Sequence, residues 1–154
     1  MELDNNAHSV FFLHYQLILV VKYRRIDSDI SDRAREIFQY IAPNYNITLQ
    51  DWNYGLDHVH IVFKAHPNSQ ISKFINAYKS ASSRLIKKEF PQIRQNLWRE
   101  YFWSQSFCLF TTGGVSDQII REYIESQGEN DRRRKGKKPT TQSSKFDMEE
   151  EVFI

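Results

Sequence analysis

The run VFFLHYQLILVVKY, from Val10 to Tyr23, limits the possible folds more than any other stretch of this sequence. It is rich in aromatic and β-branched residues, which favour the pleated surface of a sheet. It contains no acidic residue, and its first lysine comes only at Lys22. We therefore expect a long, largely buried central strand, whose polar end is the sequence KYRR.

Apolar residues at helical or strand-like spacing mark the other elements of the chain. In the segment 31–45, Ser31 or Asp32 can cap the first turn of a helix. Gly55 separates two strand-like runs further on. The expected elements after the first strand are a helix over 31–45, two strands within 47–65, a helix over 71–90, a strand over 102–112 and a helix that begins at Ser116.

This order of elements predicts an α+β fold. Strand, helix, two strands, helix, strand and helix are expected of a ferredoxin-like antiparallel sheet with helices on one face, here followed by a C-terminal helix. The same architecture would equally serve an RNA-recognition module, so the function has to be inferred from a site.

The composition predicts one packed domain followed by a charged tail. With 154 residues, of which 40% are hydrophobic, the chain is long enough for a single core, and we place the domain at residues 1–128. Residues 129–154 are rich in charge and poor in apolar side chains, so we expect a flexible tail. The net charge of +2 gives no argument by itself for a nucleic-acid partner.

Cysteine usage and hydropathy indicate the compartment. Cys108 is the single cysteine and cannot form an internal disulfide, and the sequence shows neither a secretory signal nor an apolar run long enough to span a bilayer. We expect a cytoplasmic protein without a membrane partner. No Walker-type phosphate-binding sequence is present, so no nucleotide cofactor is expected.

The stretch DHVHIVF, residues 57–63, is the first candidate site. Side chains two apart on a strand point to the same face, so His58 and His60 could close around one metal ion while Val59 faces the core. The pair alone is a weak signal, and two half-exposed strand histidines are an equally good interpretation.

The second candidate site is REYIESQ, residues 121–127. Tyr123 and Gln127 are four apart on a predicted helix and therefore share a face. For such a pair in isolation, a core tyrosine and an ordinary surface glutamine are the simpler interpretation.

Together, these motifs resemble those of a known family, the small single-tyrosine transposases of the HUH class, called TnpA. The resemblance spans about residues 8–128 and implies a DNA transposase that cleaves and rejoins single-stranded DNA at insertion-sequence ends through a 5′-phosphotyrosine intermediate. The segments that carry it, in order, are KYRR, DHVHIVF, the basic segment ISKFINAYKSASSRLIKKEF, LWREYFWSQSFCLFTTGGV and YIESQ.

The resemblance also implies the roles of the site residues. Tyr123 would be the nucleophile, His58 and His60 would bind a divalent metal, and Gln127 would complete the metal site. These neutral ligands leave the charge of Mg²⁺ or Mn²⁺ undiminished, which suits a catalytic ion rather than a structural one.

The resemblance further implies a homodimer, in which the tyrosine helix of one chain can complete the site of the other. Gly113 and Gly114, just before that helix, could serve as a hinge, although a simple turn explains them as well. The expected substrate is single-stranded DNA with hairpin-bearing element ends. The candidate DNA-binding residues are Lys22, Arg24, Arg25, Lys79 and Arg84, each of which could instead be an ordinary surface charge.

Other residues and functions stay open at this point. His14 could support the histidine pair or lie in the core. A non-catalytic module that binds single-stranded DNA or RNA, and a nickase of the relaxase or replication-initiator kind, are the alternative functions. The aromatic residues that could stack on bases or pack in the core or a dimer interface are Trp98, Tyr101, Phe102 and Trp103.

Overall fold

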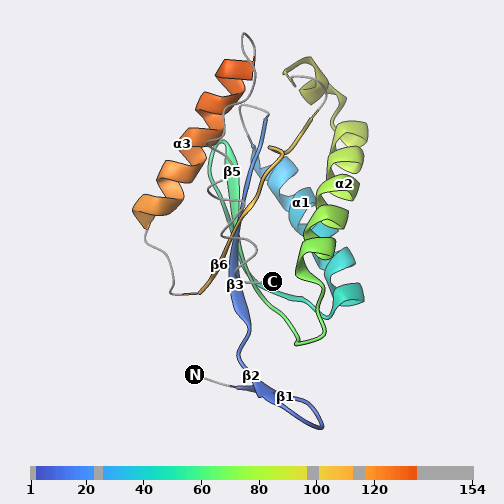
Figure 1. The fold of residues 1–154 in the computed structure, drawn as a ribbon. Helices are drawn as coiled ribbons and strands as arrows, with labels where there is room; N and C mark the ends of the chain where they lie inside the picture. The colour runs from blue at the N-terminus through green and yellow to red at the C-terminus, as the bar shows by residue number, and fades with distance from the viewer. Residues whose placement is uncertain (1–2, 23–25, 97–100, 113–116, 135–154) are drawn as a thin grey trace.

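The computed structural model describes residues 3–22, 26–96, 101–112 and 117–134. Within these ranges the main element is a four-stranded antiparallel sheet, in a chain order of strands and helices that matches the ferredoxin-like pattern (Figure 1). The expected α+β fold is therefore confirmed. The sheet order is β4 (Thr48–Tyr54), β5 (His58–Lys64), β3 (His14–Val20) and β6 (Cys108–Thr111).

The N-terminal part of the predicted first strand folds differently. The central strand β3 begins at His14, while β2 (Val10–Phe11) pairs with β1 (Asp4–Asn5) in a separate hairpin. The side chain of Asn6 accepts the backbone N–H of Ser9 at 2.8 Å, which turns the chain back on itself before β2. Apolar composition alone could not reveal this turn.

The helix α1 (Ser28–Ile41) begins earlier than expected, and the prediction that Ser31 or Asp32 caps it is wrong. The cap is Asp27, whose carboxylate accepts the backbone N–H three residues further on at 2.9 Å. Ser31 lies buried inside the helix, where its hydroxyl accepts the indole N–H of Trp52 at 3.0 Å.

One face of the sheet is covered by α1 and α2 (Ile71–Glu89), as Figure 1 shows. Phe38 of α1 contacts Phe74 and Tyr78 of α2, with ring centroids 5.0 and 5.3 Å apart, and all three side chains are buried. These aromatic contacts form the main core. Two short 3₁₀ helices, η1 (Ala42–Tyr45) and η2 (Pro91–Asn96), follow α1 and α2.

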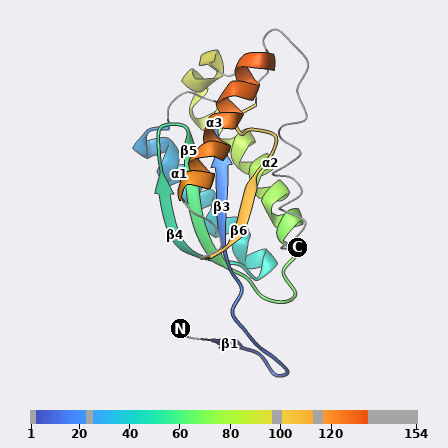
Figure 2. The ribbon, with the colours of Figure 1, turned by 60° about the vertical axis from the view of Figure 1, so that its left-hand side comes forward.

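The opposite face is covered by α3 (Asp117–Arg134), which lies across the central strands (Figure 2). It continues past the domain boundary predicted at residue 128, and its predicted start, Ser116, lies outside the described residues, as do residues 135–154. β3 is therefore buried from both sides, which accounts for its almost wholly apolar sequence. The second core, called here the α3 cluster, consists of Ile18, Val20, Cys108, Phe110, Ile120 and Tyr123.

Ser82 on α2 joins two buried groups, and its loss should destabilise the fold. Its hydroxyl donates to the carbonyl of Tyr78 at 2.6 Å and accepts the indole N–H of Trp103 at 2.8 Å. Ser82→Ala leaves that indole N–H unpaired, so we expect the free energy of unfolding to fall by about 1–3 kcal/mol in urea denaturation. Ser80→Ala, at an exposed position of the same helix, is the control. Equal stability of the Ser82 variant and the parent would contradict this assignment.

Candidate active site

The alternation of β5 places both histidines on one face of the sheet. Val59 and Ile61 are fully buried against α1 and α2, while His58 and His60 are half-buried on the face that carries α3. The prediction that the two imidazoles share a face, with Val59 in the core, is therefore confirmed.

The imidazole of His58 is held by residues of the turn between β4 and β5. Its Nδ1–H donates to Oδ1 of Asp57 at 2.9 Å, and this hydrogen bond lowers the pKa of the Asp57 carboxyl. A Cβ built on Gly55 would stand 2.6 Å from Cε1 of His58, so only glycine leaves room for the ring in this position. Sequence reasoning treated Gly55 as a strand break and missed that it packs against the imidazole.

His60 contacts a residue that sequence reasoning did not single out. Its Nε2–H donates to Oε1 of Gln16 on β3 at 2.8 Å. His14, for which support of the histidine pair or a place in the core stayed open, stacks on Phe12 with ring centroids 3.8 Å apart. It lies opposite Lys64, at the far end of β5 from His58. A polar residue on the face of an apolar strand was the available signal for Gln16.

Tyr123 and Gln127 share one face of α3, as their spacing predicts, and both are buried. The hydroxyl of Tyr123 lies 2.9 Å from Oγ of Ser106, and the side-chain oxygen of Gln127 accepts a hydrogen bond from Ser104. The side-chain nitrogen of Gln127 has no hydrogen-bond partner among the described residues. The helix thus presents its phenol and its amide inward, to the segment before β6.

This segment, residues 104–106, links α3 to α2. The ammonium group of Lys79 donates to the backbone carbonyl of Gln105 at 2.9 Å. Lys79 is a candidate DNA-binding residue, and in the structure it also contacts the segment whose serines contact both side chains of α3. The arrangement makes the position of Tyr123 depend on α2 as well as on α3.

The sheet brings the histidine pair and the α3 residues to the same face. Ile18 and Val20 are the cross-strand partners of His60 and His58, and both belong to the α3 cluster that contains Tyr123. No group of three or more His, Cys, Asp or Glu suited to a metal occurs within the described ranges.

Three basic residues of α2 line a separate groove of about 490 Å³, called here the α2 groove. Lys79 and Arg84 lie there together with Lys87 and the half-exposed ring of Tyr101. Phe102 and Trp103 also border the groove, but both are almost completely buried and pack in the core.

Of the other predicted DNA-binding residues, Lys22 lies within the described ranges and Arg24 and Arg25 do not. The backbone N–H of Lys22 donates to the carbonyl of Phe102 at 2.7 Å, beside this groove. The predicted residues outside the described ranges are Arg24, Arg25, Trp98, Gly113 and Gly114.

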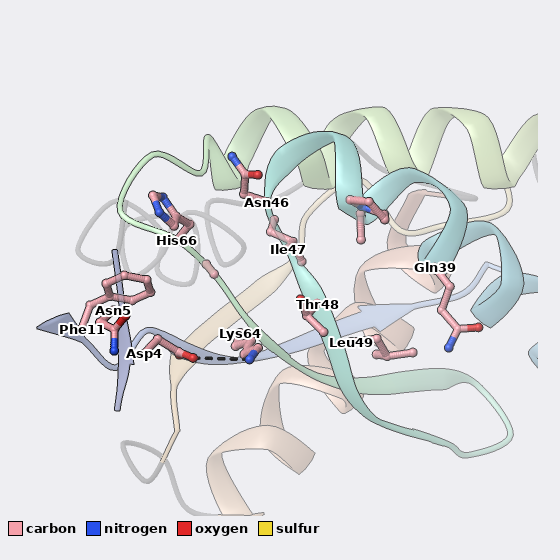
Figure 3. A pocket seen from close by; sticks show the side chains of 13 residues that line it. Asp4, Asn5, Phe11, Gln39, Asn46, Ile47, Thr48, Leu49, Lys64 and His66 are labelled. Atoms are coloured by element: carbon pink, nitrogen blue, oxygen red, sulfur yellow. Dashed lines mark hydrogen bonds and ion pairs between the residues drawn. The ribbon is translucent and has the colours of Figure 1, made fainter. Parts of the chain in front are cut away.

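The larger pocket, about 530 Å³, lies at the other end of β5 (Figure 3). Lys64 borders it and forms an ion pair with Asp4 at 3.4 Å. Lys64 is six residues from His58, about 20 Å along a strand, so this pocket is not part of the candidate site.

Comparison with known proteins assigns the chain to a family. A family model described as IS200-like transposase matches residues 9–127, a range that includes both histidines, Tyr123 and Gln127. This chain belongs to the IS200-like transposase family. As a transposase, it is an enzyme that acts on DNA.

Two curated relatives are transposases along most of their length. This transposase is 32% identical to the ISDra2 transposase TnpA of Deinococcus radiodurans over 129 residues, which cover 82% of this chain and 92% of that protein. It is 23% identical to the transposase of insertion sequence IS200 from Salmonella typhimurium, over 82% of this chain and 84% of that protein.

Solved structures agree with the fold of this transposase. A Deinococcus radiodurans protein assigned as a transposase matches with a TM-score of 0.71 and 31% identity, over 80% of this chain and 97% of that one. A REP-associated tyrosine transposase, solved bound to a REP hairpin, matches with a TM-score of 0.50 and 9% identity, over 79% and 69% of the two chains. The second likeness concerns the fold alone.

The described helices were also compared with the length and hydropathy that a membrane span needs. Each of them is too short or too polar to span a bilayer.

The two serines of the 104–106 segment should hold α3 against the sheet. Replacing Ser104 and Ser106 with Ala removes the hydrogen bonds to Gln127 and Tyr123, each worth about 1 kcal/mol. We expect the amide hydrogens of residues 118–127 to exchange about tenfold faster or more under native conditions. Ser80→Ala should leave this exchange unchanged, and unaltered protection of α3 in the double variant would contradict the assignment.

Proposed function

We propose that this transposase, acting in the cytoplasm, cleaves and rejoins single-stranded DNA at insertion-sequence ends. In this proposal Tyr123 is the nucleophile, and a divalent metal binds at His58 and His60. The observation that carries it is the placement of Tyr123 and Gln127 on one face of α3, against the sheet face that holds both histidines. All four residues lie within the region that matches the family.

The chemistry requires a nucleophile that stays attached to the cut strand. The Tyr123 oxygen would attack phosphorus and lose its proton to solvent, while the bond from phosphorus to the 3′ oxygen of the preceding nucleotide breaks. The products would be a 5′-phosphotyrosine and a free 3′-OH. Because the phosphate stays in an ester linkage, a 3′-OH can later reverse the reaction and join strands without a nucleotide cofactor.

The residues at the histidine pair fit a catalytic Mg²⁺ or Mn²⁺ ion. Two imidazoles on one strand face supply nitrogen donors, and Gln127 supplies an amide oxygen, which accepts a hydrogen bond from Ser104 in this structure. When bound, the ion would polarise a non-bridging phosphate oxygen and offset the charge that develops on phosphorus. His58 and His60 would hold it, and Gln127 would complete the site.

The position of Tyr123 implies that the described state is a resting one. Its side chain is fully buried and its hydroxyl contacts Ser106, so cleavage requires α3 to shift or a second chain to supply the helix. Gly113 and Gly114, in the link before α3, are the proposed hinge. A homodimer would also provide the two sites that excision needs, because excision involves two cuts and a strand exchange.

The groove along α2 is the proposed path of the single strand. Lys79, Arg84 and Lys87 offer positive charge, and the half-exposed ring of Tyr101 offers a stacking surface. Phosphate contacts combined with stacking are the usual basis of single-strand binding. The hairpin-bearing element ends predicted from the sequence would be the substrates.

Replacing Tyr123 with Phe should abolish the covalent DNA complex while leaving DNA binding intact. The phenol oxygen is lost, but the ring that packs in the α3 cluster remains. The measurement is incubation with single-stranded element ends and Mn²⁺, followed by a denaturing gel, with EDTA as a control. Tyr40→Phe, at a position 82% exposed, should form the complex like the parent.

Outcomes of the same assay separate the rival functions. A parent chain that binds DNA but forms no metal-dependent complex would support the non-catalytic module. A complex that persists in Tyr123→Phe would contradict the role of this tyrosine. Mixing Tyr123→Phe chains with His60→Ala chains restores the complex only if the helix acts on the partner's histidines.

Arg84→Ala should weaken binding of single-stranded DNA and reduce its salt dependence. Arg84 is exposed and borders the α2 groove, and each phosphate contact contributes about −0.7 to the slope of log K against log salt for single strands. Fluorescence anisotropy at several salt concentrations measures both quantities. Lys73→Ala, an exposed lysine of the same helix that borders a different pocket, is the matched control. An unchanged slope for Arg84→Ala would remove this residue from the DNA path.

A further inference from the structure

Gln16 is a polar residue on the sheet face that carries the histidines and α3. It alternates along β3 with Tyr15 and Leu17, which are buried on the α1 and α2 side. Its cross-strand neighbours are Val62 on β5 and Phe110 on β6. Its strand therefore lies between β5, which carries the histidine pair, and β6, which contributes Cys108 and Phe110 to the α3 cluster.

The contact between Gln16 and His60 has the spacing of two ligands of one ion. Oε1 of Gln16 lies 2.8 Å from Nε2 of His60. Mg²⁺ takes six oxygen or nitrogen ligands at about 2.0–2.1 Å in octahedral geometry, so adjacent donor atoms stand about 3 Å apart. A glutamine carbonyl oxygen is also a ligand of the hard type that Mg²⁺ and Mn²⁺ accept. The two atoms that share a proton here could share a cation instead.

The other amide of the site is engaged elsewhere in this structure. The side-chain oxygen of Gln127 accepts a hydrogen bond from Ser104, in the segment that precedes β6. Two histidines alone would leave a divalent ion with few protein ligands. Gln16, by contrast, sits on the central strand beside His60 and needs no movement of α3 to reach it.

We propose that Gln16 is a further ligand of the metal, through its side-chain oxygen. The proposal rests on the metal site of the proposed function. The sheet would then bind the ion with His58, His60 and Gln16 before α3 contributes Gln127. Loading of metal would be a property of β3 and β5, and the position of α3 would decide only whether the loaded site is complete.

The test measures metal binding by the full chain without DNA. Isothermal titration with Mn²⁺ should show that Gln16→Leu weakens affinity by about tenfold or more, whereas Gln16→Glu strengthens it by adding a charged ligand. Gln50→Leu, which replaces an exposed glutamine of β4, should bind like the parent. A melting curve without metal confirms that each variant is folded. A Gln16→Leu chain that binds Mn²⁺ like the parent would overturn the proposal.

A second variant separates direct ligation from orientation of His60. Gln16→Cys loaded with Co²⁺ should gain a sulfur-to-metal absorption band in the near ultraviolet, which only a direct bond produces. The parent, whose one cysteine, Cys108, is buried in the α3 cluster, is the control and should lack the band. Co²⁺ binding by Gln16→Cys without this band would overturn the proposal and leave Gln16 as a positioning residue. If the parent itself binds no Mn²⁺, the metal site of the proposed function fails, which is a distinct result.

Discussion

The burial of β3 on both faces is the constraint on which the rest of the structure depends. Leu17 and Leu19 point into the core formed with α1 and α2, while Ile18 and Val20 point into the α3 cluster. Because β5 pairs with β3 in a fixed register, the face to which Ile18 and Val20 point is also the face on which the two histidines lie. A slip by one residue would send both imidazoles into the main core. The apolar strand thus fixes the orientation of a site to which it contributes only one polar side chain.

The α3 cluster joins stability to function in one group of side chains. Tyr123 is both the proposed nucleophile and a fully buried part of this core. The same burial that stabilises the helix keeps the hydroxyl away from solvent and from DNA. The contacts of Ser104 and Ser106 hold this arrangement from the opposite side. In the proposed mechanism, activation would exchange packing within the chain for contacts with substrate or partner.

The sequence predicted the strands of the main sheet and the helices that pack on it, because apolar residues recur in these elements at regular strand or helix spacing over long runs. It also predicted that His58 and His60 share a face, since a strand alternates with a period of two. It could not predict the N-terminal hairpin, which depends on the side chain of Asn6, or the cap at Asp27, because several acidic and hydroxyl residues compete there. Contacts between distant segments, such as that of Gln16 with His60, leave no pattern in a single sequence.

The hydrogen bond of Lys79 limits where one positive charge of this surface can act. A lysine on a helix that faces a groove is easily assigned to a phosphate, yet its ammonium group donates to the carbonyl of Gln105. A direct contact between a phosphate and this ammonium group would have to form beside its hydrogen bond to Gln105, or in place of it. Because a carbonyl is neutral, Lys79 keeps its positive charge and still attracts nucleic acid, but its ammonium group is held in place between α2 and the segment before β6.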